Sequence, residues 1–144
     1  MNPICNLEAE QVVLGTLIGD PKAAHFVGML HIDDFGAKQH RLIFEAFEIA
    51  ASEGRHASPV VLTPQFRGQK VGGISMAEYL SRIMSMMTRR ECISDYIRAL
   101  KDMSGRRVLA EMSIRMKEVS NSASASLPEF LDQLTDACDG IMSG

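Results

Sequence analysis

The sequence contains no tryptophan, few cysteines and no long apolar run. Its three cysteines, Cys5, Cys92 and Cys138, are widely spaced and form no CxxC pair. This is the pattern of reduced thiols rather than of a disulfide framework. No stretch approaches the roughly 18 apolar residues of a membrane-spanning helix, and the first residues lack the basic and apolar regions of a signal peptide. These absences predict a cytoplasmic protein that does not enter a membrane.

Motifs for catalysis or cofactor binding are also missing. No GxxxxGKS or GxxxxGKT loop is present to hold nucleotide phosphates. The histidines His25, His31, His40 and His56 show no HExxH or HxxxH spacing, and no cysteine is placed to complete a zinc site. We interpret each histidine as a surface or capping residue. We therefore expect no enzymatic activity, no catalytic residue, no metal site and no cofactor site in this stretch of chain.

The composition is that of an ordinary globular domain. Hydrophobic residues make up 46% and charged residues 23% of the 144 residues, enough for one domain with a sizeable core. The net charge of −3 argues against a domain whose main work is to neutralise nucleic-acid phosphate. We therefore expect little direct DNA binding.

The stretch Lys38–Ser52 has the strongest helical pattern. Polar residues recur there at steps of three and four and draw one stripe along a helix: Lys38, Arg41, Glu45, Glu48 and Ser52. Most of the remaining positions are apolar, which is typical of a helix covered by several neighbours. We therefore expect this helix to be the centre of a helical domain, with only its charged edge in water.

Capping residues and apolar spacing predict further helices. Asn6 is a plausible N-cap, with Glu8 and Glu10 near the positive end of the helix that follows. A short helix over residues 23–30 and a loop over residues 68–73 come next in our interpretation. Three capping boxes then mark the starts of helices. These boxes are Ser75 to Glu78, Thr88 to Glu91, and Ser126 to Glu129.

The fold class that these patterns predict is all-α. We place a boundary near Ser104-Gly105, where we expect the helix to bend or break. Residues 1–104 then form a compact multi-helix domain, and residues 105–144 form a projecting antiparallel helical hairpin that turns at the small polar run 120–126. The first arm is mainly basic and the second is acidic, which favours antiparallel pairing of the two arms.

Apolar stripes on the two arms make the hairpin a candidate interface. The residues that we select for such an interface are Met112, Met116, Val119, Leu127, Leu131, Leu134 and Cys138. Two interpretations stay open. The stripes either bind a second chain or hold the two arms of one chain together.

Several stretches resemble the N-terminal domain of DnaB-type replicative helicases. Residues 6–15 look like that family's opening signature EAEQ.VLG, and residues 40–46, HRLIFEA, are similar to its HRLIYEAI. Residues 71–73 with Tyr79-Leu80 resemble its GG..YL. The order and spacing agree along most of the chain. Pro64 and Thr88 depart from the family pattern and leave the local conformation there open.

The resemblance implies a role as well as a fold. In such helicases six copies of this domain form a collar, a trimer of dimers built partly by hairpin pairing. The collar docks the C-terminal domain of primase and affects helicase loaders. The motor that binds ATP and Mg²⁺ lies outside this stretch, so we expect a non-catalytic fragment of an ATP-dependent DNA helicase that self-associates.

Two other classes of protein fit the same patterns. A free-standing helical adaptor or inhibitor that binds a host helicase or primase is one alternative. A small DNA-binding regulator is the other, and the acidic balance disfavours it.

Overall fold

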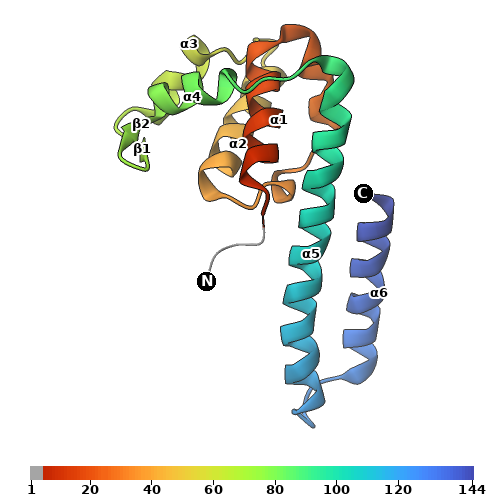
Figure 1. Cartoon of the computed structure of the whole chain (residues 1–144). Coiled ribbons are helices and arrows are strands. Elements are labelled where there is room, and N and C mark those ends of the chain that lie inside the picture. The colour runs from red at the N-terminus through yellow and green to blue at the C-terminus, as the bar shows by residue number, and fades with distance from the viewer. Residues whose placement is uncertain (1–4) are drawn as a thin grey trace.

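The computed structural model describes residues 5–144, which form a helical head with a long hairpin projecting from it (Figure 1). The fold is all-α apart from one very short pair of antiparallel strands. No helix among the described residues has the length and apolarity to cross a bilayer. The elements in chain order are α1 (Leu7–Gly19), the 3₁₀ helices η1 (Pro21–Met29) and η2 (Ile32–Asp34), α2 (Lys38–Ser52), α3 (Pro59–Leu62), η3 (Thr63–Phe66), β1 (Lys70–Val71), β2 (Ile74–Ser75), α4 (Met76–Met84), η4 (Arg90–Cys92), α5 (Ile93–Ser120) and α6 (Leu127–Ser143).

The centre of the head is α1, and our assignment of that place to α2 is wrong. Every residue of α1 from position 12 to position 18 is buried, and the helix packs against α5, α4, η1 and α2. The bounds expected for α2 are confirmed, but Leu42 and Ile49 on its outer face are 36% and 45% exposed. One face of α2 therefore meets the core, and the opposite face meets solvent.

Gly15 lets α4 lie directly against α1. A Cβ added at Gly15 would lie 1.9 Å from the carbonyl oxygen of Ile83, a backbone atom of α4. Behind this crossing the core holds three fully buried phenylalanines. The rings of two of them, Phe35 and Phe44, tilt against each other with centroids 4.9 Å apart. The helices pack closely because one of them has no side chain at the crossing point.

Most of the expected helix caps are confirmed. Asn6, Ser75 and Ser126 each accept a hydrogen bond from the backbone N–H three residues on, at 3.0, 3.2 and 3.4 Å. The box predicted at Thr88 is wrong. The Thr88 N–H instead donates to Thr16 Oγ1 at 2.9 Å, and the chain passes through η4 before α5 begins at Ile93.

Three local expectations also need correction. The helix expected over residues 23–30 is a 3₁₀ helix, η1, which begins at Pro21, where Asp20 caps it, and ends at Met29. The expected loop over residues 68–73 contains β1 and makes a tight turn at Gly72 and Gly73, whose φ angles are 57° and 87°. The bend expected at Ser104-Gly105 is wrong, since α5 continues through both residues.

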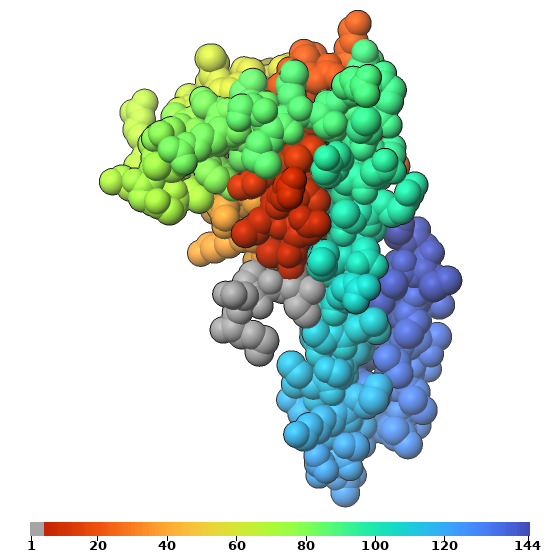
Figure 2. All heavy atoms as spheres, viewed as in Figure 1, coloured from red at the N-terminus to blue at the C-terminus, as the bar shows by residue number. Residues whose placement is uncertain are grey.

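The head and the hairpin share α5. Its first turns bury Ile93, Ile97 and Leu100 in the head, and the later turns carry α6 at their side (Figure 2). Gly105 is buried where the two meet, and a Cβ there would lie 3.2 Å from a methyl carbon of Ile141. The glycine that predicted a break therefore provides room for α6. The division into domains at residues 104 and 105 stays a prediction.

Gly15→Ala tests the crossing of α1 and α4. The added methyl group meets a backbone carbonyl that can move only with its helix, so we expect a loss of about 2 kcal/mol or more in the free energy of unfolding. Urea unfolding followed by circular dichroism measures it. Gly140→Ala is the matched control, because nothing lies within 4 Å of a Cβ at that helical glycine. That variant should gain about 0.5–1 kcal/mol. Equal behaviour of the two variants would contradict the close-approach role of Gly15.

Candidate interaction surface

The hairpin consists of the later turns of α5 and the whole of α6, which run antiparallel away from the head (Figure 1). The contact between the two helices is apolar. Met112 and Phe130 are 8% and 5% exposed, and Val108, Leu134 and Ile141 are half-buried. No ion pair joins the two helices in the described part of the chain, so the opposite charges of the arms are not what holds them together. The side-chain hydrogen bond between them runs from Arg115 to Gln133.

The seven residues predicted for the interface fall into two groups. Met112 is buried and Val119 and Leu134 are half-buried, so these three hold the arms together. The other four are exposed: Met116 (46%), Leu127 (58%), Leu131 (50%) and Cys138. Contact between the two arms therefore accounts for the first three residues, and binding of a second chain by the other four stays a prediction. The prediction omitted residues of both groups: Val108, Phe130 and Ile141 inside the hairpin, and Leu109, Ile114 and Met142 outside it.

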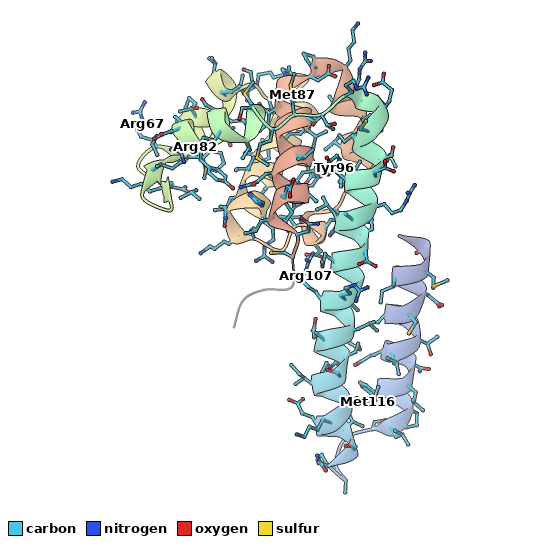
Figure 3. The ribbon with its side chains drawn as sticks, viewed as in Figure 1. Arg67, Arg82, Met87, Tyr96, Arg107 and Met116 are labelled. Carbon is cyan, nitrogen blue, oxygen red and sulfur yellow. The ribbon has the colours of Figure 1, made fainter. Side chains whose placement is uncertain are left out.

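Most of the exposed apolar residues of the hairpin lie on one side, and the exception is Ile114, which is 60% exposed on the side of α5 away from α6. On α5, Leu109 and Met116 are seven residues apart and flank buried Met112 on the same side. On α6, exposed apolar residues recur at steps of four and seven on the corresponding side of Phe130. Consider each helix viewed along its own axis from N- to C-terminus. Because α5 and α6 are antiparallel, residues that are displaced in the same rotational direction from the contact line lie on the same side of the hairpin. Figure 3 shows Met116 beside α6. We call this set the apolar face: Leu109, Met116, Leu127, Leu131, Cys138 and Met142.

Apart from its contact with α5, α6 has little support from its own chain. The helix packs against α5 and lies clear of the centre of the head (Figure 2). Its exposed surface divides into the apolar face and an acidic part with Glu129, Asp132, Asp136 and Asp139. A contiguous exposed apolar surface beside charged residues is typical of a protein–protein interface.

A buried polar network holds the head that carries this hairpin. Glu10 on α1 and His40 on α2 are fully buried, and His40 Nδ1 lies 2.8 Å from Glu10 Oε1. The backbone N–H groups of Gly36 and Ala37 donate to the same carboxylate at 3.0 and 3.2 Å. His40 Nε2 lies 2.5 Å from the hydroxyl of Tyr79 on α4. The network therefore joins α1, α2 and α4 and the residues that lead into α2.

The structure corrects one prediction at this network. Glu10 lies in the first turn of α1 as expected, but His40, which was expected to be a surface or capping residue, is fully buried. Local spacing carries no signal for a contact between residues 30 positions apart, so the sequence pattern could not reveal it. His31 and Asp34 do serve as caps: Asp33 N–H donates to His31 Nδ1, and Asp34 accepts from the His31 N–H. Asp34 also pairs with Lys101 of α5 at 2.6 Å.

The hydrogen bonds of the network fix the charge of Glu10 and the tautomer of His40. An ionised carboxylate only accepts hydrogen bonds, so Nδ1 of His40 carries the proton that faces Glu10. Burial raises the pKa of Glu10, but the hydrogen bonds from His40, Gly36 and Ala37 outweigh it and lower that pKa from its ordinary value of 4.5. Tyr79 is only 8% exposed, so the whole network lies in the core of the head. Within residues 5–144 we find no cluster of side chains that could hold a metal ion.

Glu10→Gln tests the energetic role of the network. The folded-state pKa of Glu10 is lowered, so its contribution is present above the ordinary pKa of 4.5 and is lost as the pH falls through the folded value. We expect the variant to lose about 3 kcal/mol of unfolding free energy at pH 7. It should also lose stability less steeply than the parent chain below pH 4.5. Urea unfolding at a series of pH values measures both effects.

Glu8→Gln is the matched control for that substitution. Glu8 is an exposed carboxylate in the first turn of the same helix. Its substitution should change the free energy of unfolding by less than about 0.5 kcal/mol. A Glu10→Gln variant as stable as this control, with an unchanged acid dependence, would contradict the role of the network.

Two comparisons of the sequence with known proteins identify similar helicase sequences. The family model described as DnaB-like helicase N terminal domain matches residues 2–102. The replicative DNA helicase DnaC of Bacillus subtilis (strain 168) is 30% identical over 145 residues. That alignment covers 97% of this chain and 31% of the relative, so the chain spans about a third of the relative's length.

A solved structure shows the same fold over both the head and the hairpin. It is the crystal structure of the N-terminal domain of DnaB helicase from Mycobacterium tuberculosis, with a TM-score of 0.78 and 24% sequence identity. The match covers 94% of this chain and 98% of that chain. Together with the family match over residues 2–102, these findings show that the chain belongs to the DnaB-like helicase N-terminal domain family.

Proposed function

We propose that this chain is the non-catalytic N-terminal collar domain of a replicative DNA helicase. In that role it assembles helicase subunits into a ring and docks primase or a loader during DNA replication. The observation that carries the proposal is the apolar face of the hairpin, where Leu127, Leu131 and Met116 are about half exposed. The name of the Bacillus subtilis relative, a replicative helicase, supports the biological process.

The geometry of the hairpin favours assembly with a second copy. Leu109 and Met116 from α5 and Leu127, Leu131 and Met142 from α6 offer apolar area on a part of the molecule that projects from the head (Figure 2). Burial of that area against another hairpin removes apolar surface from water at roughly 25 cal/mol per Å². A two-fold axis brings the same patch of both copies together, as in most homodimers. Three such dimers make the hexameric collar.

The same proposal includes partners and a motor. The collar offers a docking surface to the C-terminal domain of primase, or to a helicase loader, in the cytoplasm. ATP and Mg²⁺ bind a RecA-like motor that follows this domain in a longer chain, and DNA contacts are made mainly by that motor. The share of the relative covered here, 31%, supports this arrangement, because the remaining length of that protein is sufficient for a motor.

Leu131→Asp is the most direct test of hairpin pairing. Leu131 is 50% exposed, so an aspartate there meets water in the monomer but lies in an apolar contact in a dimer. We expect light scattering to show a drop from dimer or hexamer to monomer. The free energy of unfolding of the separated chain should change by less than about 0.5 kcal/mol.

Met112→Asp is the matched control on the inner face of the hairpin. Met112 is 8% exposed, so the new carboxylate is buried between α5 and α6 without a partner. We expect it to destabilise the hairpin by several kcal/mol. Loss of stability in Leu131→Asp, with no change in its mass before unfolding, would contradict hairpin pairing between copies.

Self-association together with primase docking separates the collar from a free-standing adaptor, which binds a helicase or primase without building a collar of its own. We expect the purified chain to form a stable mixed complex with the cognate primase's C-terminal domain, as measured by light scattering. A chain that stays monomeric and ignores primase would contradict the collar role and favour the adaptor or inhibitor.

A further inference from the structure

A groove lies between the start of α2 and the β hairpin that β1 and β2 form. Figure 1 shows this β hairpin at the end of the head away from α6. Lys38, Gln39 and Leu42 of α2 form one wall of the groove, and residues 69–72 form the other. Its volume is about 490 Å³, within the range of roughly 300–1,000 Å³ that is typical of ligand-binding clefts. No residue of the apolar face lines it, so the groove is separate from the surface proposed for assembly.

Both walls of the groove are basic. Lys38 on α2 and Lys70 on β1 are exposed, and no carboxylate is among the described residues that line the groove. No ion pair of either lysine is found within residues 5–144. The groove is therefore a local exception to the net charge of −3 of the whole chain. Two ammonium groups at the walls of one groove repel each other, and an anionic group between them removes that repulsion.

The backbone of β1 directs hydrogen-bonding groups away from β2. Val71 pairs with Ile74 beside the tight turn, and the Met76 N–H donates to the Gln69 carbonyl at 3.1 Å. Lys70 lies between these two hydrogen-bonded positions of β1. In antiparallel pairs, hydrogen-bonded positions alternate with positions whose N–H and C=O groups point outward, so those of Lys70 point away from β2. No residue of β2 lines the groove, so the outer edge of β1 borders it.

An extended acidic peptide matches these features. Extended peptides bind to exposed sheet edges through backbone hydrogen bonds, and pockets for alternate side chains give specificity. Leu42 is 36% exposed and Val71 is half-buried, so the groove also has an apolar part. We propose that the groove binds an extended acidic segment of a partner protein. The segment adds a strand at the outer edge of β1, with carboxylates near Lys38 and Lys70 and an apolar side chain against Leu42.

The groups at the groove distinguish this partner from two others. A second copy of β1 would bring its own Lys70 beside this one, and lysines on edge strands disfavour such pairing. The phosphates of a nucleic acid only accept hydrogen bonds, so they leave the outward carbonyl of Lys70 without a donor. An acidic peptide supplies both carboxylates and backbone N–H donors. Charge and backbone together therefore favour a peptide.

The contact is small, so we expect weak binding. β1 contains only two residues, and its outward backbone groups belong to Lys70. A contact of this size falls short of the area of about 1,200 Å² that stable interfaces bury, and we expect a Kd on the order of 100 μM. The inference goes beyond the proposed assembly role and does not rest on it, because a single head contains the whole groove.

Fluorescence anisotropy of a labelled acidic peptide tests the inference on the purified chain. The probe has about eight residues in which aspartate and leucine alternate, because alternate side chains of an added strand face the same way. We expect saturable binding with a Kd on the order of 100 μM. Two altered probes are controls. A peptide with asparagine in place of aspartate lacks the charge, and a fully N-methylated peptide cannot donate hydrogen bonds to β1. Both should bind at least about five-fold more weakly.

Charge reversals at the two lysines locate the peptide on the chain. We expect Lys38→Glu and Lys70→Glu each to weaken binding about five-fold or more at low salt, because a carboxylate replaces the ammonium group beside the carboxylates of the peptide. Lys22→Glu is the matched control for net charge. Lys22 is exposed on η1 and does not line the groove, so this variant should bind like the parent chain. An unchanged circular dichroism melting curve establishes that each variant is folded.

Hydrogen exchange of the Lys70 amide tests the added strand. Its N–H points away from β2, so we expect fast exchange in the free chain and slower exchange with saturating peptide. The Gly68 amide is the control, because Gly68 lies in the same connection but does not line the groove. Its exchange should not change.

Binding that depends on the aspartates of the probe and on both lysines, with slower exchange at Lys70, supports the inference. Absence of saturable binding overturns it, as does equal binding by the two lysine variants and the Lys22→Glu control. Full binding by the N-methylated peptide, or unchanged exchange at Lys70, also overturns it. Displacement of the peptide by a single-stranded oligothymidine would assign the groove to nucleic acid instead. These results are independent of hairpin pairing, which light scattering measures separately.

Discussion

Three segments of the head meet at the carboxylate of Glu10, which is fully buried: α1 itself, the residues that lead into α2, and α2. A buried carboxylate is costly unless several donors surround it, and here His40 and the N–H groups of Gly36 and Ala37 provide three hydrogen bonds. His40 in turn forms a hydrogen bond with the hydroxyl of Tyr79 on α4. These bonds tie α2, with the residues that lead into it, and α4 to α1.

The same network gives a structural role to residues in the stretches that carry the family resemblance. Glu10, His40 and Tyr79 lie in the three stretches by which the sequence resembles DnaB-type N-terminal domains, and the structure brings the three side chains together in the core. The stretches that identify the family in this chain are therefore architectural. They hold the head, while the exposed apolar side chains of the hairpin carry the proposed assembly.

The sequence could predict features that depend on neighbouring residues. The bounds of α2, the caps at Asn6, Ser75 and Ser126, and the two arms of the hairpin all follow from local spacing. Features set by distant contacts could not be predicted in this way. A central helix is defined by how many elements surround it, which is why α1 was missed. The sequence alone predicts that Gly105 breaks the helix. Its actual role, to make room for Ile141 of α6, depends on how α6 packs on α5. The inner and outer residues of the hairpin likewise separate only when α6 is packed on α5.

The central claim is that the apolar face of the hairpin is covered by another copy in solution. Hydrogen exchange of α6 amides at low and high protein concentration tests it directly, because α6 packs mainly against α5 within its own chain. The account predicts that protection of amides near Leu131 and Cys138 rises with concentration, while amides of buried α1 exchange at the same rate throughout. Exchange in α6 that is fast and independent of concentration would contradict it.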